Sequence, residues 1–301
     1  MKKRAFKTVM LREGPYHLLL LPCVIVVFIF SYVPLYGLVI AFQKYNIARG
    51  FSSPWVGLAN FRQLISQAQF SRTIWNTLYI AVFKIIGGIL VPVVFSLLLN
   101  EIQDVTFKRV FQTLIYLPYF LSWVIMAGVL IDILSLDGIL NRFLGLFGTE
   151  PVSFLTDPKI FPWTMIITDI WKGFGFGTVV YLAALTSIDP ELYEAALADG
   201  AGRWKQTLYI TLPMLAPTVV LMSILSLGNI LNAGFDQIYN LYSPIVYSSG
   251  DIIDTFVFRL GIQQAQYSIG TAVGMFKSVI SALLIVSSQY LADKLAGYRV
   301  F

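Results

Sequence analysis

The sequence has very little of what most catalytic and metal sites need. Its 301 residues include one cysteine, Cys23, and one histidine, His17. A single cysteine excludes a disulfide within the chain, and a zinc site needs several converging ligands. Any Ser-His-Asp or Cys-His arrangement would have to use His17, which lies close to the N-terminus. The composition therefore argues against nucleophilic catalysis and against a bound metal.

Charge and nucleotide-binding motifs are scarce as well. Charged residues make up 12% of the chain, against about 25% in soluble domains. The net charge of +5 is modest, and no basic cluster outside the N-terminal tail suggests nucleic-acid binding. No phosphate-binding loop of the form G-x-x-x-x-G-K-[ST] occurs, so we expect no ATPase activity from this chain and no cofactor bound to it. A glycine-rich patch at 173–177 does not follow a strand and is expected to serve close helix packing or to form a pliable break in the helix.

Long apolar runs are what the chain has in abundance. Hydrophobic residues make up 57%, and the mean hydropathy is +0.75. Each run has roughly the 20 residues that cross a bilayer core, and backbone groups in lipid must be satisfied within helices. The expected fold is therefore an all-α integral membrane protein with about six transmembrane helices. We expect the spans at about residues 16–42, 77–99, 110–134, 162–186, 213–234 and 270–291, after a basic tail at 1–15.

The distribution of lysine and arginine predicts the orientation of these spans. With the N-terminus inside, the cytoplasmic segments hold eleven Lys and Arg residues and the longer outer loops hold seven. Cytoplasmic loops carry an excess of these residues in membrane proteins. Both termini, and the loop at 187–212, are therefore expected in the cytoplasm.

The loop at 187–212 is a polar island between two apolar runs. Asp189 can cap a helix that begins at Pro190, and Gly200 can take the left-handed conformation that ends a helix. The sequence predicts a short helix, a tight turn and a second short helix. One interpretation is an ordinary cytoplasmic loop made of good helix formers.

The same loop also resembles a known motif. Glu194-Ala195-Ala196, then Asp199-Gly200-Ala201, then Ile210-Thr211-Leu212-Pro213 are similar to the EAA loop of binding-protein-dependent ABC importer permeases. In that family the loop is a coupling helix that docks on a cytoplasmic ATPase. The resemblance implies ATPase-coupling roles for Glu194, Ala195, Ala196, Asp199, Gly200, Ala201, Arg203 and Pro213.

Two further stretches extend the resemblance over nearly the whole chain. Residues 32–61, with Tyr32-Val33-Pro34-Leu35-Tyr36-Gly37, resemble the LplB or YteP type of carbohydrate permease, which is similar to the maltose type but serves complex oligosaccharides. The segment 171–189 fits the same pattern. The resemblance implies a type I ABC importer permease fold, with residues 16–301 as one transmembrane permease domain.

The resemblance also implies partners and a mechanism. The expected assembly contains a second, related permease in a heterodimer, two ABC ATPase subunits that bind ATP and Mg, and an extracytoplasmic solute-binding protein. It would lie in the bacterial cytoplasmic membrane and import carbohydrate by alternating access. This chain would supply half of the path and no bond chemistry.

Ionisable residues inside the expected spans are candidates for the translocation path, because they are costly in lipid and usually face a wet interior. They are Lys84, Asp132, Asp169, Lys172 and Lys277. Asp169 and Lys172 share a helix face and are expected to pair with each other. We take Asp169, Lys172 and Lys277 as path candidates. The alternative is a structural ion pair, or lysines that extend to the membrane interface, Lys84 above all.

Two rival functions remain open from the sequence. An ion-coupled secondary sugar transporter would use Asp169 and Lys172 as coupling groups and would not need the loop at 187–212. A membrane-embedded glycosyltransferase would need a polar loop with clustered acids, and none is found. Aromatic residues in the outer loops fit either an interfacial belt or a platform for an external partner.

Overall fold

The computed structural model describes residues 2–296, and side chains are described between residues 14 and 287 apart from Pro15. Within that range the chain is helical, and its extended structure is limited to the isolated bridges Gln43–Trp55 and Asn46–Gly50. The basic side chains of the tail at 1–15, and those of Lys294 and Arg299, lie outside the described residues, as does the C-terminal Phe301.

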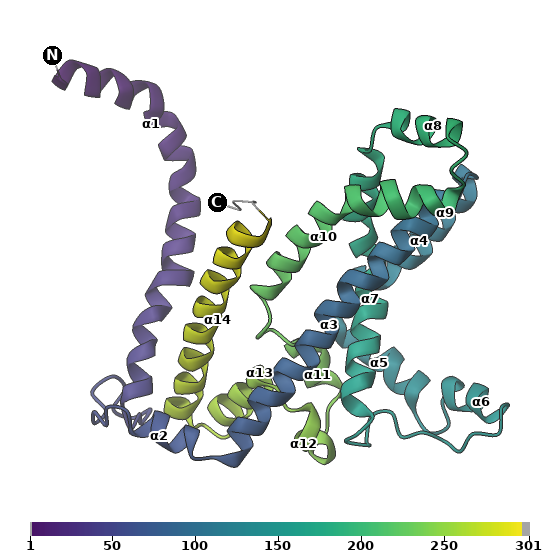
Figure 1. Ribbon diagram of the computed structural model, residues 1–301. Coiled ribbons are helices and arrows are strands. Elements are labelled where there is room, and N and C mark those ends of the chain that lie inside the picture. Colours follow the sequence, from purple (N-terminus) through teal and green to yellow (C-terminus); the bar gives the residue numbers. More distant parts are fainter. Residues whose placement is uncertain (1, 297–301) are drawn as a thin grey trace.

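The first helical run stands apart from the rest of the molecule (Figure 1). It consists of α1 (Lys2–Val27), η1 (Phe28–Tyr32) and η2 (Val33–Phe42). None of its most apolar stretch is buried, and it meets the rest of the chain through η2 and α14 (Tyr267–Ala296). Its apolar side chains are therefore free to face lipid or another chain.

The core is built on two long helices, α3 (Ala68–Glu101) and α7 (Phe161–Thr186), which pack along one another. Glycines permit this close approach. A Cβ atom added to Gly87 would lie 2.1 Å from Ile170 Cδ1, and one at Gly177 would lie 2.9 Å from Pro92 Cγ. Ile80 and Met165 are fully buried where the helices meet.

The expected span at 110–134 is two helices. α4 (Val105–Phe120) and α5 (Trp123–Leu134) are separated at Leu121 and Ser122, where the backbone becomes extended. The Ser122 hydroxyl starts α5 by accepting a hydrogen bond from Ile125 N at 3.3 Å. α4 packs on α7 at Gly175, where a Cβ would lie 2.0 Å from Ile115 O. Gly175 and Gly177 thus serve close helix packing, as predicted.

The fifth span also departs from its expected bounds. A continuous helical run through α9 (Arg203–Gln206), η3 (Thr207–Thr211) and α10 (Leu212–Leu227) ends at Leu227, and residues 228–234 form a turn. Short helices follow before α14. The remaining elements are α2 (Ala59–Ile65), α6 (Ile139–Gly145), α8 (Pro190–Ala198), α11 (Phe235–Leu241), η4 (Pro244–Val246), α12 (Tyr247–Gly250), α13 (Ile253–Phe258) and η5 (Arg259–Gln263).

Five described helical stretches are long and apolar enough to cross a membrane. They are Tyr16–Phe42, Ala68–Glu101, Trp123–Gly145, Arg203–Leu227 and Tyr267–Ser287. The 26-residue α7 is not among them, because Asp169 and Lys172 lower its mean hydropathy. At roughly 1.5 Å per residue, however, α7 is about 39 Å long, which exceeds a hydrocarbon core of about 30 Å. Its crossing of the membrane remains a prediction.

Candidate coupling loop and membrane cavity

The polar island forms the helix, turn and helix that the sequence predicts. Asp189 caps α8, since its Oδ1 accepts a hydrogen bond from Glu191 N at 3.0 Å, and Pro190 is the first residue of the helix. Gly200 follows the helix with φ +77°. Two backbone hydrogen bonds close the turn: Gly200 N donates to Leu197 O at 3.0 Å, and Ala201 N donates to Ala196 O at 2.8 Å.

Most of the predicted coupling residues lie on the surface of this loop. Glu194, Ala195, Asp199, Gly200 and Arg203 are exposed, Ala196 and Ala201 are half-buried, and Pro213 is exposed as the second residue of α10. Leu197 on the same helix is 68% exposed. Figure 1 shows α8 at one end of the molecule. The start of α1 and the end of α14 lie toward the same end.

Three contacts connect the loop to the long helices. Tyr193 Oη on α8 lies 3.0 Å from Thr211 Oγ1 at the start of the fifth span. Gln206 Nε2 donates to Ala201 O at 3.0 Å. Arg203 Nη1 lies 3.1 Å from Glu101 Oε2 at the end of α3. A displacement of the loop would therefore be transmitted to α3 and to α10.

A polar cavity of about 490 Å³ lies between α3, α7 and the turn at 228–234. Side chains with oxygen or nitrogen atoms line it from α3, α7, α10 and the turn: Lys84, Asp169, Ser226, Asn229 and Asn232. Asn229 and Asn232 are exposed, and they are joined by a hydrogen bond of 3.2 Å. The sequence predictions missed Ser226, Asn229 and Asn232. Their spacing of three residues, at the end of an apolar run, is the signal that could have found them.

Lys84 is the centre of a buried network, and it does not extend to the interface. Its Nζ donates to Ala233 O at 2.8 Å and to Gln237 Oε1, and it lies 3.4 Å from Asp169 Oδ1. Gln237 in turn donates to Met165 O and Thr168 Oγ1, each at 2.8 Å. Gly234 makes room for this network, because a Cβ there would lie 2.8 Å from Lys84 Nζ.

The predicted pairing of Asp169 with Lys172 is wrong. Asp169 meets Lys84, while Lys172 Nζ donates to Tyr119 O at 3.0 Å. The Lys172 ammonium also lies 5.5 Å and 5.1 Å from the ring centres of Tyr119 and Trp123. It therefore stabilises the free carbonyl end of α4. The physical reason is that the break between α4 and α5 leaves the Tyr119 carbonyl within hydrogen-bond distance of this cation, while Asp169 is paired with Lys84.

Lys277 reaches the other side of the same turn. Its Nζ lies 2.5 Å from Asp254 Oδ1 and 2.7 Å from Asn232 Oδ1. Lys84 and Lys277 thus hold the turn at 228–234 from α3 and α14. Of the three path candidates, Asp169 lines the cavity, Lys277 contacts a lining residue, and Lys172 lies elsewhere.

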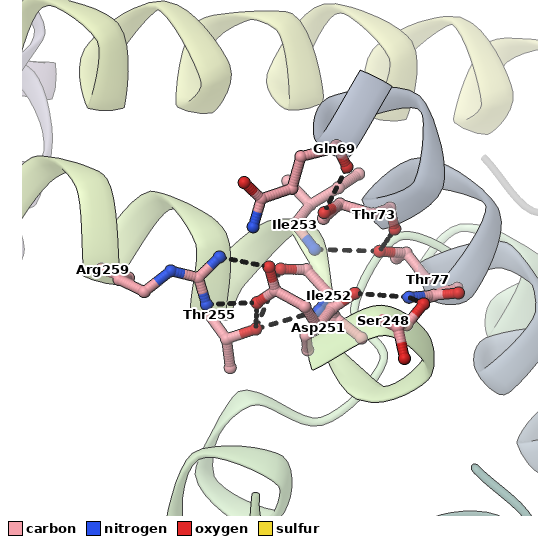
Figure 2. Close-up of polar contacts among 10 residues, drawn as sticks. Gln69, Thr73, Thr77, Ser248, Asp251, Ile252, Ile253, Thr255 and Arg259 are labelled. Atoms are coloured by element: carbon pink, nitrogen blue, oxygen red, sulfur yellow. Dashed lines mark hydrogen bonds and ion pairs between the residues drawn. The ribbon is translucent and has the colours of Figure 1, made fainter. Parts of the chain in front are cut away.

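A second buried network attaches the connection between α10 and α14 to α3 (Figure 2). Arg259 makes a two-pronged contact with Asp251, and Thr255 Oγ1 donates to Asp251 Oδ1 at 2.8 Å. Thr77 on α3 accepts from Ile253 N at 2.9 Å. Burial by itself would lower the pKa of Arg259, but the Asp251 carboxylate outweighs it and the pKa is raised. The network therefore stays charged and attaches the segment 251–259 to α3.

Comparison with known proteins identifies the family. The family model described as "Binding-protein-dependent transport system inner membrane component" matches residues 84–297. The chain belongs to this family. It is 39% identical over 285 residues to Protein LplB of Bacillus subtilis (strain 168), covering 94% of this chain and 90% of that protein.

Two further relatives are similar over nearly their full lengths. The polygalacturonan/rhamnogalacturonan transport system permease protein YteP of Bacillus subtilis (strain 168) is 38% identical over 302 residues, 100% of this chain and 94% of YteP. A chain of the bacterial alginate ABC transporter, solved in complex with an alginate pentasaccharide-bound periplasmic protein, superposes with a TM-score of 0.87. It is 37% identical, with 95% of this chain and 96% of that chain covered.

Family and structure together confirm the resemblance to the LplB and YteP group and the all-helical type I ABC permease fold. The chain is an inner membrane component of an ABC transporter, a kind of subunit that is not itself an enzyme.

Proposed function

We propose that this protein is one of two permease subunits of an ABC importer that takes up oligosaccharides or polysaccharide fragments. The observation that carries the proposal is the exposed helix–turn–helix at 187–212, attached to both α3 and α10 at one end of the molecule. The relatives named for polygalacturonan, rhamnogalacturonan and alginate support a carbohydrate substrate.

The loop would couple ATP hydrolysis to the spans. When ATP closes the two ATPase subunits onto each other, α8 moves with the ATPase subunit on which it docks. Tyr193 and Arg203 then pass this movement to the fifth span and to α3, whose far portions line the polar cavity. Helices with fixed contacts move as rigid bodies. Their movement would open the cavity to one side of the membrane while it closes the other side.

The cavity would form part of the sugar path. Sugars are neutral and rich in hydroxyl groups, so amide, hydroxyl and carboxylate groups that converge in a cavity suit them. Ser226, Asn229, Asn232 and Asp169 supply such groups. A solute-binding protein would deliver the sugar from outside, while ATP and Mg would bind to the ATPase subunits.

Orientation follows from the basic residues. Eleven Lys and Arg residues on the side of both termini and the loop, against seven on the other side, favour a cytoplasmic position for the termini and for α8. The start of α1 and the end of α14 lie on the same side of the molecule as α8, which agrees with this orientation (Figure 1).

The rival ion-coupled carrier would use Asp169 and Lys172 as coupling groups, and of these two only Asp169 lines the cavity. Uptake into vesicles that contain the whole complex and its binding protein separates the two functions. We expect uptake of labelled oligosaccharide to require ATP and to persist when the proton and sodium gradients are abolished. Uptake that follows an ion gradient without ATP would refute the importer.

A further inference from the structure

We propose that the cavity at Lys84 and Asp169 selects neutral, hydroxyl-rich sugar units and rejects uronate units. The proposal rests on the proposed function, because it assigns a substrate class to the cavity of that transporter. The two alginate and polygalacturonan relatives carry names of acidic polysaccharides, so the proposal does not follow from them. It follows from the donors and acceptors that the cavity leaves free.

The cation in the cavity has no donor left for a sugar carboxylate. A lysine ammonium has three N–H donors. Lys84 Nζ has three oxygen partners, Ala233 O, Gln237 Oε1 and Asp169 Oδ1, and its side chain is 8% exposed. A uronate that approached Lys84 would have to displace a buried hydrogen bond. Such a bond is costly to break in a dry interior.

The anion in the cavity, by contrast, has a free acceptor. The Asp169 side chain is 35% exposed, and its one contact with a cation among the described residues is made by Oδ1. Asp169 lines the cavity, and no hydrogen bond or ion pair in the described part of the chain uses its Oδ2. A carboxylate oxygen accepts hydrogen bonds from hydroxyl groups and repels a second carboxylate. It favours a neutral pyranose over a uronate of the same size.

The other polar groups of the cavity add no positive charge. Ser226, Asn229 and Asn232 are neutral. Lys277 is absent from the cavity lining, and it contacts Asp254 on the far side of Asn232. Lys172 lies outside the lining as well: it contacts Tyr119 and Trp123, and it interacts with Asp169 only electrostatically. A uronate in the cavity would therefore meet Asp169 without a free cation in the lining itself.

The test uses the whole transporter without its solute-binding protein, so that the selectivity of the binding protein does not mask the selectivity of the cavity. Saturation-transfer NMR would measure binding of xylopentaose and of pentagalacturonate, two probes of equal length. We expect the neutral probe to bind at least about tenfold more tightly, equivalent to about 1.4 kcal/mol. In Asp169→Asn the free acceptor charge is lost, and we expect the preference to shrink at least about tenfold.

Two further variants complete the design. Asp132→Asn removes an exposed carboxylate outside the cavity and should leave the preference unchanged. Asn229→Asp adds a carboxylate to the cavity without removing a partner of Lys84, and it should weaken pentagalacturonate binding further while xylopentaose still binds. This second variant keeps the test decisive if Asp169→Asn fails to fold.

Each outcome has a defined consequence. Equal or tighter binding of pentagalacturonate to the unaltered transporter overturns the proposal, and so does an unchanged preference in both cavity variants. Binding of neither probe, while sugar still stimulates ATP hydrolysis in the complete system, also overturns it but leaves the importer intact. Absence of any sugar-dependent ATP hydrolysis would instead refute the proposed function itself.

Discussion

At the scale of single residues, Gly234 decides whether the cavity turn can form. Its φ of +94° lies in the region that favours glycine, and a side chain at that position would also meet Lys84 Nζ. The same residue therefore permits both the backbone turn after α10 and the buried contacts of Lys84 with Ala233 and Gln237.

We predict that Gly234→Ala lowers stability and abolishes sugar uptake. The left-handed conformation costs a residue with a Cβ roughly 1–2 kcal/mol, and displacement of Lys84 adds to this cost. The melting temperature of the purified complex and uptake in vesicles are the measurements. Gly128→Ala is the control, because a Cβ at this helical position meets nothing within 4 Å. Equal behaviour of the two variants would show that Gly234 is not constrained.

A second prediction concerns the partner of Asp169. A double-mutant cycle between Lys84→Met and Asp169→Leu should give a coupling energy in the range of about 0.5–3 kcal/mol, because the double variant leaves no stranded charge. The same cycle between Asp169 and Lys172 should give a smaller coupling energy, because these neighbours on α7 interact electrostatically without forming an ion pair. Thermal unfolding of the complex supplies the numbers. Coupling to Lys172 instead of Lys84 would contradict the arrangement in the structure.

The sequence predicts the residues whose environment is local and misses those whose partners are distant. Asp189 and Gly200 were predicted correctly because a cap and a left-handed turn depend on neighbours in the chain. The partner of Asp169 could not be predicted, because it depends on how closely α3 approaches α7. That approach is set by contacts such as Gly87 against Ile170, which no single-helix pattern contains.

At the scale of elements, apolarity predicts that a segment lies in a helix and says little about where the helix breaks. The runs at 110–134 and 213–234 are largely apolar, yet the helices are interrupted at Leu121 and after Leu227. Both interruptions expose backbone carbonyls that lysines then bind: Tyr119 O by Lys172 and Ala233 O by Lys84. These breaks therefore depend on tertiary partners.

The coupling loop is the element with the sharpest prediction. Gly200→Val should reduce sugar uptake strongly while insertion and expression stay normal, because φ is +77° and the surrounding space is empty. The penalty is then one of backbone conformation alone. Gly200→Asn should retain much of the uptake, since asparagine tolerates the left-handed region.

Two comparisons test this explanation. Gly202→Val should be tolerated, because Gly202 has φ −70° and no atom within 4 Å of a Cβ. Glu194→Ala should weaken co-purification of the ATPase without loss of the folded permease. Normal uptake by both Gly200→Val and Glu194→Ala would show that α8 is not the coupling element.

At the scale of the whole molecule, the arrangement separates two functional ends. The exposed loop with α8 lies at one end, while α2, α6 and α12 lie at the opposite end (Figure 1). The polar cavity opens between α3, α7 and the turn after α10, away from the loop itself. If α8 is the coupling element, movement of the ATPase would have to act on the cavity over the length of the helices. The contacts of Tyr193 and Arg203 with the ends of α10 and α3 are suited to this task.

The orientation of this arrangement in the membrane can be tested directly. We predict that a reporter enzyme that is active only outside the cytoplasm gives no signal when it is fused after Phe301, because the basic residues favour a cytoplasmic C-terminus. The same reporter inserted at Gly148, an exposed glycine that follows α6, should be active, because α6 lies at the opposite end of the molecule from α8 (Figure 1). A strong signal at Phe301 together with none at Gly148 would reverse the topology. It would place α8 on the side without ATP, and the coupling role of the loop would fail with it.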